Sequence, residues 1–248
     1  MQISRNDLKN LLHSSIPQRE QLDNTYFLLP KTRCHRRTNC CAMLPEMTLL
    51  EALDAVQRLT DLPPLLRARV LKNIVRYFLL NPVEITSCPF LENQDCLIYE
   101  NRFFGCRAYG LWSPEYYEKI AKSSRQAKRY IQKQWQDLGV SLPQNVINCS
   151  IPYCSNVKRT DHKELNDKTL LDAANAIENL SQCFLPWHEL FHRKYFSDLS
   201  FFITALIFGV TGSIQIKFTV VRNIVNNRDR ALLNKIIEEV IDPLGNLP

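Results

Sequence analysis

The chain is poor in glycine, with six glycines in 248 residues, and it contains no glycine-rich phosphate loop. Dinucleotide fingerprints and P-loops need closely spaced glycines because the backbone must approach a phosphate group. The G-x-S-x-G turn that presents a serine nucleophile in α/β-hydrolases is also missing. These absences argue against nucleotide binding through such loops and against a serine hydrolase of that class.

Long apolar segments are missing as well. Residues 1–20 have neither the apolar core nor the small-residue cleavage site of a signal peptide, so we expect a cytoplasmic protein. The most apolar stretch, Leu199 to Ile216, is interrupted by serine and threonine and is followed by Lys217. It falls short of a membrane span, and we expect it to be a buried element.

Cysteine, by contrast, is abundant: the chain has nine cysteines, and eight of them lie between residues 34 and 154. In a chain without a secretion signal, thiols bind metal or carry out chemistry more often than they form disulfides. Thiolates suit zinc, copper(I) and iron–sulfur clusters, and eight thiolates are enough for two four-cysteine sites. The predicted metal ligands are Cys34, Cys40, Cys41, Cys88, Cys96, Cys106, Cys149 and Cys154. The ninth, Cys183, stands in an apolar context and is expected to be an inert core residue.

The hydrophobic pattern predicts a mainly α fold, with α+β as the alternative and at most a small sheet. The expected helices cover residues 46–59, 63–80, 113–138, 170–180 and 229–241, with a further helix from Pro186. Alternating apolar residues predict a strand at 214–220. The three cysteine-bearing segments show no regular period and are expected to be loops, with Pro89 and Gly105 as bend points.

Composition changes little along the chain, so the sequence predicts a single domain over residues 1–248. Its core would be the cysteine cluster at 30–156, interrupted by a helical insertion at 46–80. A helical C-terminal region would follow at 160–248. The insertion is expected to form a hairpin that returns the chain from Cys41 to Cys88.

Two features near the cysteines bear on the number of sites. In an extended backbone, Cys40 and Cys41 would point to opposite sides and could serve two sites. Five arginines lie beside the cysteines and could offset the negative charge of thiolates: Arg33, Arg36, Arg37, Arg102 and Arg107. His35 lies in the first segment and is either a ligand or a solvated loop residue.

The cysteine pattern resembles that of the YkgJ-type cysteine-cluster family, described as a zinc- or iron-chelating domain, over residues 30–110. That family begins with C-x2-C-x2-C-C, of which Cys34, Cys40 and Cys41 match three positions, while Arg37 replaces the second cysteine. Its later segment, C-x2-Y-x2-R-P-x2-C-R, follows an upstream cysteine that corresponds to Cys88. The later segment is matched by Cys96, Tyr99, Arg102, Cys106 and Arg107, with Phe103 in place of the proline.

The resemblance implies a metal or iron–sulfur centre, and flagellin lysine N-methylases are similar in carrying such a cluster. The leading prediction is therefore one or two iron–sulfur clusters, with 4Fe-4S favoured and zinc as the alternative. The centre would serve electron transfer or a redox-dependent modification, with a redox partner or a protein substrate. Tyr99, Arg102 and Arg107 would lie around the ligands, and whether the protein is an enzyme is left open.

Two alternatives remain open. The cysteines could hold structural zinc while the basic helix from Lys119 to Lys133 binds an acidic partner or a nucleic acid such as RNA. Alternatively, His188, Glu189 and His192 fit the H-E-x-x-H pattern of a zinc hydrolase. No third ligand is evident for that site, although three acids could be proposed: Asp198, Glu238 and Glu239.

Overall fold

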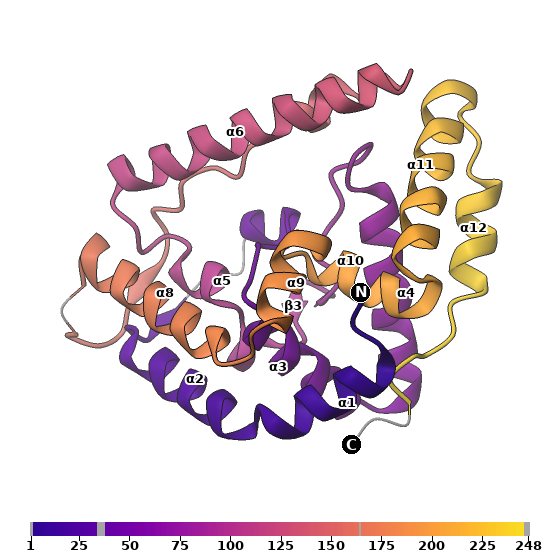
Figure 1. The fold of residues 1–248 in the computed structure, drawn as a ribbon. Coiled ribbons are helices and arrows are strands. Elements are labelled where there is room, and N and C mark those ends of the chain that lie inside the picture. The colour runs from indigo at the N-terminus through magenta and orange to yellow at the C-terminus, as the bar shows by residue number, and fades with distance from the viewer. Residues whose placement is uncertain (1, 34–37, 164, 246–248) are drawn as a thin grey trace.

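The computed structural model describes residues 2–33, 38–163 and 165–245. In this part of the chain the fold is mainly helical, with two small antiparallel sheets, as predicted (Figure 1). The α-helices are α1 (Arg5–Ser14), α2 (Ile16–Leu28), α3 (Leu49–Thr60), α4 (Pro64–Leu80), α5 (Phe104–Ala108), α6 (Pro114–Asp137), α7 (Gln144–Ile147), α8 (Asp167–Gln182), α9 (Trp187–Tyr195), α10 (Leu199–Phe208), α11 (Val210–Asn227) and α12 (Ala231–Glu238).

The long helices begin where the sequence predicts them. Thr48 and Glu51 form a capping box at the start of α3, each side chain bonding the backbone of the other. The Ser113 hydroxyl accepts a hydrogen bond from the Tyr116 N–H at the start of α6, where Pro114 occupies the first turn. Local capping residues therefore mark these two boundaries in the sequence.

The two helices of the insertion do not form a tight hairpin. α3 packs mainly on α1, α2, α8 and α9, whereas α4 packs on α10, α11 and α12. Figure 1 shows α4, α11 and α12 side by side at one end of the molecule, with α2 and α8 at the other. The insertion therefore joins two parts of the core. Its two helices do not pack as the predicted hairpin, although the chain does return beside Cys41 as expected.

The predicted strand at 214–220 is also wrong, because these residues belong to α11. The buried positions of this helix are Val210, Ser213, Val220 and Val221, whose spacings of three, seven and eight residues follow a helical period. Its other apolar residues are partly exposed, and Ile214 is 51% exposed. The alternation that suggested a strand thus combines one buried face with apolar residues on the surface.

Helices α10 and α11 meet at Gly209, where a positive φ of 72° turns the chain. Most of α10 is buried, as expected, but the apolar stretch continues into α11, where Ile214 is 51% exposed. No single helix among the described residues is both long and apolar enough to cross a membrane. The α10 and α11 pair, bent by 107°, passes that test of length and composition only when the two are taken together.

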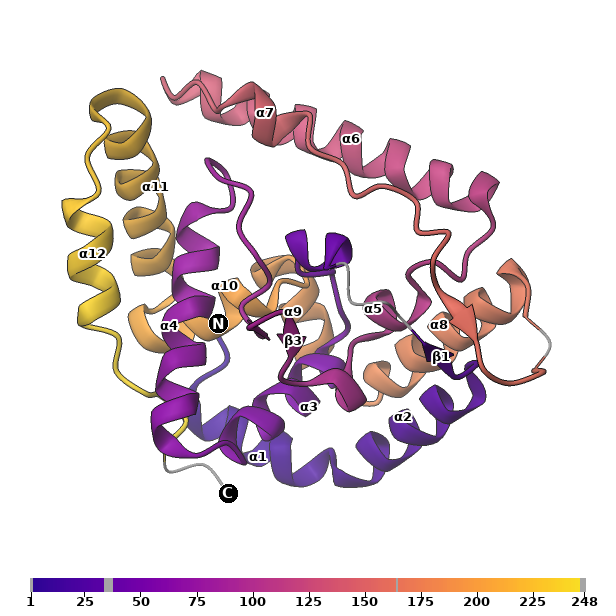
Figure 2. The ribbon, with the colours of Figure 1, turned by 180° about the vertical axis from the view of Figure 1, so that it is seen from behind.

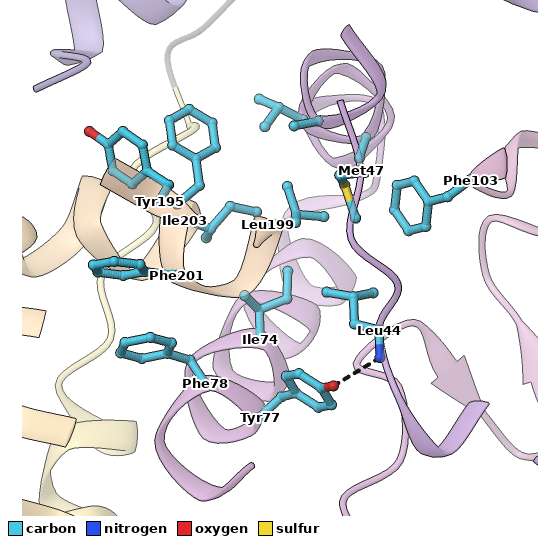
Figure 3. Close-up of a cluster of buried hydrophobic side chains, with 14 of the residues drawn as sticks. Leu44, Met47, Ile74, Tyr77, Phe78, Phe103, Tyr195, Leu199, Phe201 and Ile203 are labelled. Carbon is cyan, nitrogen blue, oxygen red and sulfur yellow. Dashed lines mark hydrogen bonds between the residues drawn. The ribbon is translucent and has the colours of Figure 1, made fainter. Parts of the chain in front are cut away.

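The centre of the core lies where α4 and α10 meet (Figure 3). The rings of Phe78 and Phe201 stack there with centroids 5.0 Å apart. The Leu44 N–H donates a 2.8 Å hydrogen bond to the Tyr77 hydroxyl, drawn as a dashed line in Figure 3. This bond fixes the chain that follows Cys40 and Cys41 to the rigid helix α4.

Short elements lie within the first two cysteine-bearing segments, so the prediction that these two segments are loops is wrong, whereas residues 149–154 have no regular structure, as predicted. β1 (Thr32–Arg33) pairs with β4 (Lys158–Arg159), and β2 (Leu91–Glu92) pairs with β3 (Asp95–Cys96), both antiparallel. Two 3₁₀ turns, η1 (Asn39–Ala42) and η2 (Tyr99–Asn101), complete the region. The first sheet brings the chain before the first cysteine segment beside the chain after the third (Figure 2).

Candidate metal centre

Five cysteines from four short segments line one small cavity of about 70 Å³. They lie in η1, just before β2, in β3 and in α5. Each of them is partly buried. The cysteines of this thiol cavity are Cys40, Cys41, Cys88, Cys96 and Cys106.

Backbone hydrogen bonds hold these segments together. The Cys88 N–H donates to the Cys41 carbonyl at 2.5 Å, so the chain returns from the insertion beside the point where it left. The β2–β3 pairing then places Leu91 opposite Cys96. The tight bend between these strands lies at Asn93 and Gln94, whose φ angles of 49° and 68° suit a two-residue hairpin turn.

The predicted bend point at Gly105 is wrong, because Gly105 lies inside α5. A side chain there would meet the ring of Pro45, since a Cβ atom would lie 2.7 Å from the Pro45 Cβ. Close packing against the chain that follows η1 therefore accounts for this glycine.

A buried carboxylate anchors the helix that carries Cys106. Glu51 is only 4% exposed, and its Oε1 accepts hydrogen bonds from the Tyr26 hydroxyl and the Phe104 N–H, both at 2.7 Å. Its Oε2 accepts from the Thr48 N–H at 3.0 Å. One side chain thus ties α2, α3 and α5 together. The sequence indicated Glu51 only as a helix cap and gave no sign of the other contacts.

Cys40 and Cys41 approach each other instead of facing apart. They lie in a 3₁₀ turn, and their Sγ atoms are 3.9 Å apart. Two thiolates on one tetrahedral ion, with metal–sulfur bonds of about 2.3 Å, would have their sulfurs about 3.8 Å apart. The expectation that the two point to opposite sides of an extended chain is therefore wrong.

Burial and mutual contact set the acidity of the thiols. The hydrogen bond from Cys41 lowers the pKa of Cys40 to about 7, and the pKa of Cys41 rises in return. Burial raises the pKa of Cys88 to about 12 and raises that of Cys106 well above its usual value. Burial also raises the pKa of Cys96, and the positive charge of Arg102 lowers that pKa by a smaller amount.

The donor set fits a thiophilic metal, although the thiols surround the cavity at a distance from one another. Among the described residues, no three cysteine, histidine or acidic side chains lie close enough to hold a single ion. Cysteine has one rotatable side-chain bond with three staggered positions, so modest changes can redirect each sulfur. The arrangement brings together soft ligands, which suit zinc and iron–sulfur clusters.

Of the three residues predicted around the ligands, Tyr99 and Arg102 line the thiol cavity. The Arg102 guanidinium lies over the Tyr99 ring at 3.9 Å and donates to the Tyr99 carbonyl at 2.9 Å. Arg107 instead lies over the ring of Tyr26 at 4.3 Å and donates to the Arg102 carbonyl at 2.7 Å. Arg107 thus fixes the backbone of this segment and is not part of the cavity lining.

The remaining predicted ligands fall into two groups. Cys149 lines a second, larger cavity of about 330 Å³, which also reaches Cys40 and Cys106. Cys154 lines neither cavity, and its carbonyl lies against Gly110. Four residues of the first segment lie outside the described residues, namely Cys34, His35, Arg36 and Arg37.

Cys183 is not a core residue, contrary to the prediction. It follows the last turn of α8, and its side chain is exposed. Of the two apolar residues that follow it and suggested burial, Phe184 is buried but Leu185 is 55% exposed.

The H-E-x-x-H residues lie on a helix, α9, as the pattern requires. The His188 Nδ1 lies 2.9 Å from the Ser181 hydroxyl, and its Nε2 lies 2.8 Å from Glu178. His192 is exposed, and its Nδ1 lies 3.0 Å from the Ser197 hydroxyl. Both ring nitrogens of His188 therefore already have protein partners.

We expect the substitution His188→Ala to leave the metal content of the purified protein unchanged. Both imidazole nitrogens are engaged in contacts that join α8 and α9, so the side chain has a structural role. Metal analysis of the variant beside the parent protein measures this. Loss of one zinc equivalent per chain would show that α9 carries a metal site.

The basic helix α6 has no fully buried residue. In Figure 1 it crosses one side of the molecule, separate from the layer formed by α2 and α8. Lys119, Lys122, Arg129 and Lys133 are exposed, whereas Arg125 and Lys128 turn toward the larger cavity. Binding of an acidic partner or RNA by the exposed side stays a prediction.

Comparison with known proteins adds no relative: no known family matches the chain, and neither curated proteins nor solved structures give a match. The resemblance to the YkgJ-type family therefore rests on the cysteine pattern described above.

Proposed function

We propose that this chain is a cysteine-cluster protein that holds an iron–sulfur cluster in the thiol cavity. The observation that carries the proposal is the convergence of five thiols, from segments up to 66 residues apart in sequence, on one small cavity. Thiols gathered in this way are the ligands that iron–sulfur clusters use. The cysteine pattern shared with the YkgJ-type family supports the same conclusion.

A polynuclear centre suits the spacing of the thiols better than a single zinc ion does. The sulfurs around one tetrahedral zinc lie about 3.8 Å apart and leave no open space between them. Here five cysteines line a cavity of about 70 Å³, and the Sγ atoms of Cys40 and Cys41 lie 3.9 Å apart. No three potential ligands among the described residues lie close enough to hold one ion. A 4Fe-4S cluster takes four cysteines. We therefore assign Cys88, Cys96, Cys106 and one member of the Cys40–Cys41 pair.

The surroundings supply positive charge for such a centre. Arg102 lines the cavity, and its charge favours the thiolate forms of Cys40, Cys96 and Cys106. Cations and hydrogen-bond donors around a cluster tune its potential. When bound, an iron–sulfur cluster supplies electron transfer, so we propose a role in electron transfer or a redox-dependent modification, with a redox partner or a protein substrate.

A reducing compartment keeps thiols of this kind available for metal, and on that ground we propose that the protein acts in the cytoplasm. The second candidate, structural zinc, draws its support from the Cys40–Cys41 distance. A protein with an iron–sulfur cluster and a protein with structural zinc differ in colour and in metal and sulfide content.

Purification under anaerobic conditions, followed by iron, sulfide and zinc analysis, distinguishes the iron–sulfur cluster from structural zinc. We expect a brown protein with about four irons and about four sulfides per chain and a broad visible absorption. A colourless protein with one zinc and neither iron nor sulfide would contradict the cluster and support structural zinc.

A further inference from the structure

The larger cavity, of about 330 Å³, lies between helix α6 and the cysteine-bearing segments. Its size is at the lower end of small-molecule binding sites. At about 30 Å³ for each water in the liquid, it holds roughly ten water-sized groups. A ligand of roughly ten to fifteen non-hydrogen atoms therefore fits.

Aromatic side chains form much of the wall, and their contacts fix them in place. The Tyr117 hydroxyl donates to the Ile151 carbonyl at 2.7 Å, and the Tyr109 hydroxyl donates to the Pro152 carbonyl at 2.5 Å. The two rings meet edge to face with centroids 6.1 Å apart. Trp112 completes the wall. A preformed aromatic wall favours a flat, apolar ligand because little order is lost on binding.

One side of the cavity is positively charged. Arg125 and Lys128 line it from α6, and none of the described residues that line it is acidic. Arg125 is paired with Glu118. The Lys128 Nζ donates to the Cys149 carbonyl at 2.6 Å, a neutral partner, and an ammonium group has two further protons to donate. Lys128 can therefore bind an anionic group of the ligand.

We infer that this cavity is a binding site for a small aromatic carboxylate, whose ring lies against Tyr117 and Trp112 and whose carboxylate meets Lys128. Cys40 and Cys106 line both this cavity and the thiol cavity. A bound ligand would thus lie beside the proposed cluster. The closeness of the ligand to a cluster rests on the proposed function, whereas the binding site itself does not.

The test uses indole-3-propionate as the probe and isothermal titration calorimetry of the full chain as purified. We expect saturable 1:1 binding with a dissociation constant on the order of 100 µM or tighter. Indole-3-propanol, which has the same ring without the carboxylate, should bind at least about tenfold more weakly. Absence of saturable binding, or equal binding of acid and alcohol, would overturn the inference.

Two matched pairs of variants locate the site. Ser124 lines the cavity, whereas Ser123 next to it is exposed, so Ser124→Phe should abolish binding and Ser123→Phe should not. Lys128→Gln should weaken binding by about tenfold, and Lys133→Gln, at an exposed position of the same helix, should have no effect. Equal results within either pair would contradict the proposed position.

Metal content of the same preparations keeps the two proposals separate. We expect Ser124→Phe to retain the parent's metal while losing the ligand, because Ser124 does not line the thiol cavity. A protein that binds the carboxylate but holds no metal would refute the proposed function alone. A metal-loaded protein that fails to bind it would refute the ligand site alone.

Discussion

Substituting Cys88, Cys96 or Cys106 by serine is expected to remove most of the bound metal. The three thiols approach the cavity from separate segments, and none of them has another cysteine beside it in the sequence, unlike Cys40 and Cys41. Serine keeps the size of the side chain but is a poor ligand for soft metals. Metal analysis after anaerobic purification measures the loss, which should be at least about tenfold.

Single substitutions at Cys40 and Cys41 should have smaller effects than the double substitution. With sulfurs 3.9 Å apart, either thiol can occupy the same corner of the site. Each single variant should keep part of its metal, and the double variant should lose it. Cys183→Ser, at an exposed position that lines neither cavity, is the control and should behave as the parent. Full metal content in Cys106→Ser would rule out the assigned ligand set.

Removing the Glu51 carboxylate should cost more stability than any other polar substitution near the site. In Glu51→Ala, the buried Tyr26 hydroxyl and the Phe104 N–H lose their acceptor, and α3 loses half of its capping box. An unsatisfied buried donor costs about 1–3 kcal/mol, and a lost cap costs about 1 kcal/mol. We expect the free energy of unfolding to fall by about 3 kcal/mol, measured by urea denaturation.

Two further variants test the reason for that loss. Glu51→Gln keeps an oxygen that can accept from the Phe104 N–H, so it should be less harmful than alanine. Glu20→Ala removes an exposed acid from α2 and should change stability by less than about 0.5 kcal/mol. If Glu51→Ala lowered the free energy of unfolding as little as Glu20→Ala does, the hydrogen bonds by which Glu51 joins α2, α3 and α5 would not contribute to stability.

Local chemistry allowed much of the fold to be predicted. Capping by Thr48 and Ser113 set the starts of α3 and α6, and the mainly α class followed from helical periods. Short-range patterns failed where packing decides the outcome. Residues 214–220 alternate like a strand, yet they continue a helix because α11 packs against α4 and α10.

The candidate site was predictable in its ligands but not in its arrangement. Clustered cysteines in a sequence are a specific sign of a metal site, and five of the eight predicted ligands line one cavity. The close approach of the Cys40 and Cys41 sulfurs depends on a 3₁₀ turn that the sequence pattern does not predict. The larger cavity depends on how α6 lies over the cysteine-bearing segments, which is a long-range property.

The most direct test of the cluster is a metal-edge X-ray absorption spectrum of the anaerobically purified protein. The proposal predicts an iron edge with a first shell of sulfur only, at about 2.3 Å, together with metal–metal scattering. The same spectrum should be lost in Cys106→Ser and kept in Cys183→Ser. A first shell of nitrogen and oxygen, or a spectrum unchanged in Cys106→Ser, would contradict a metal centre built from these cysteines.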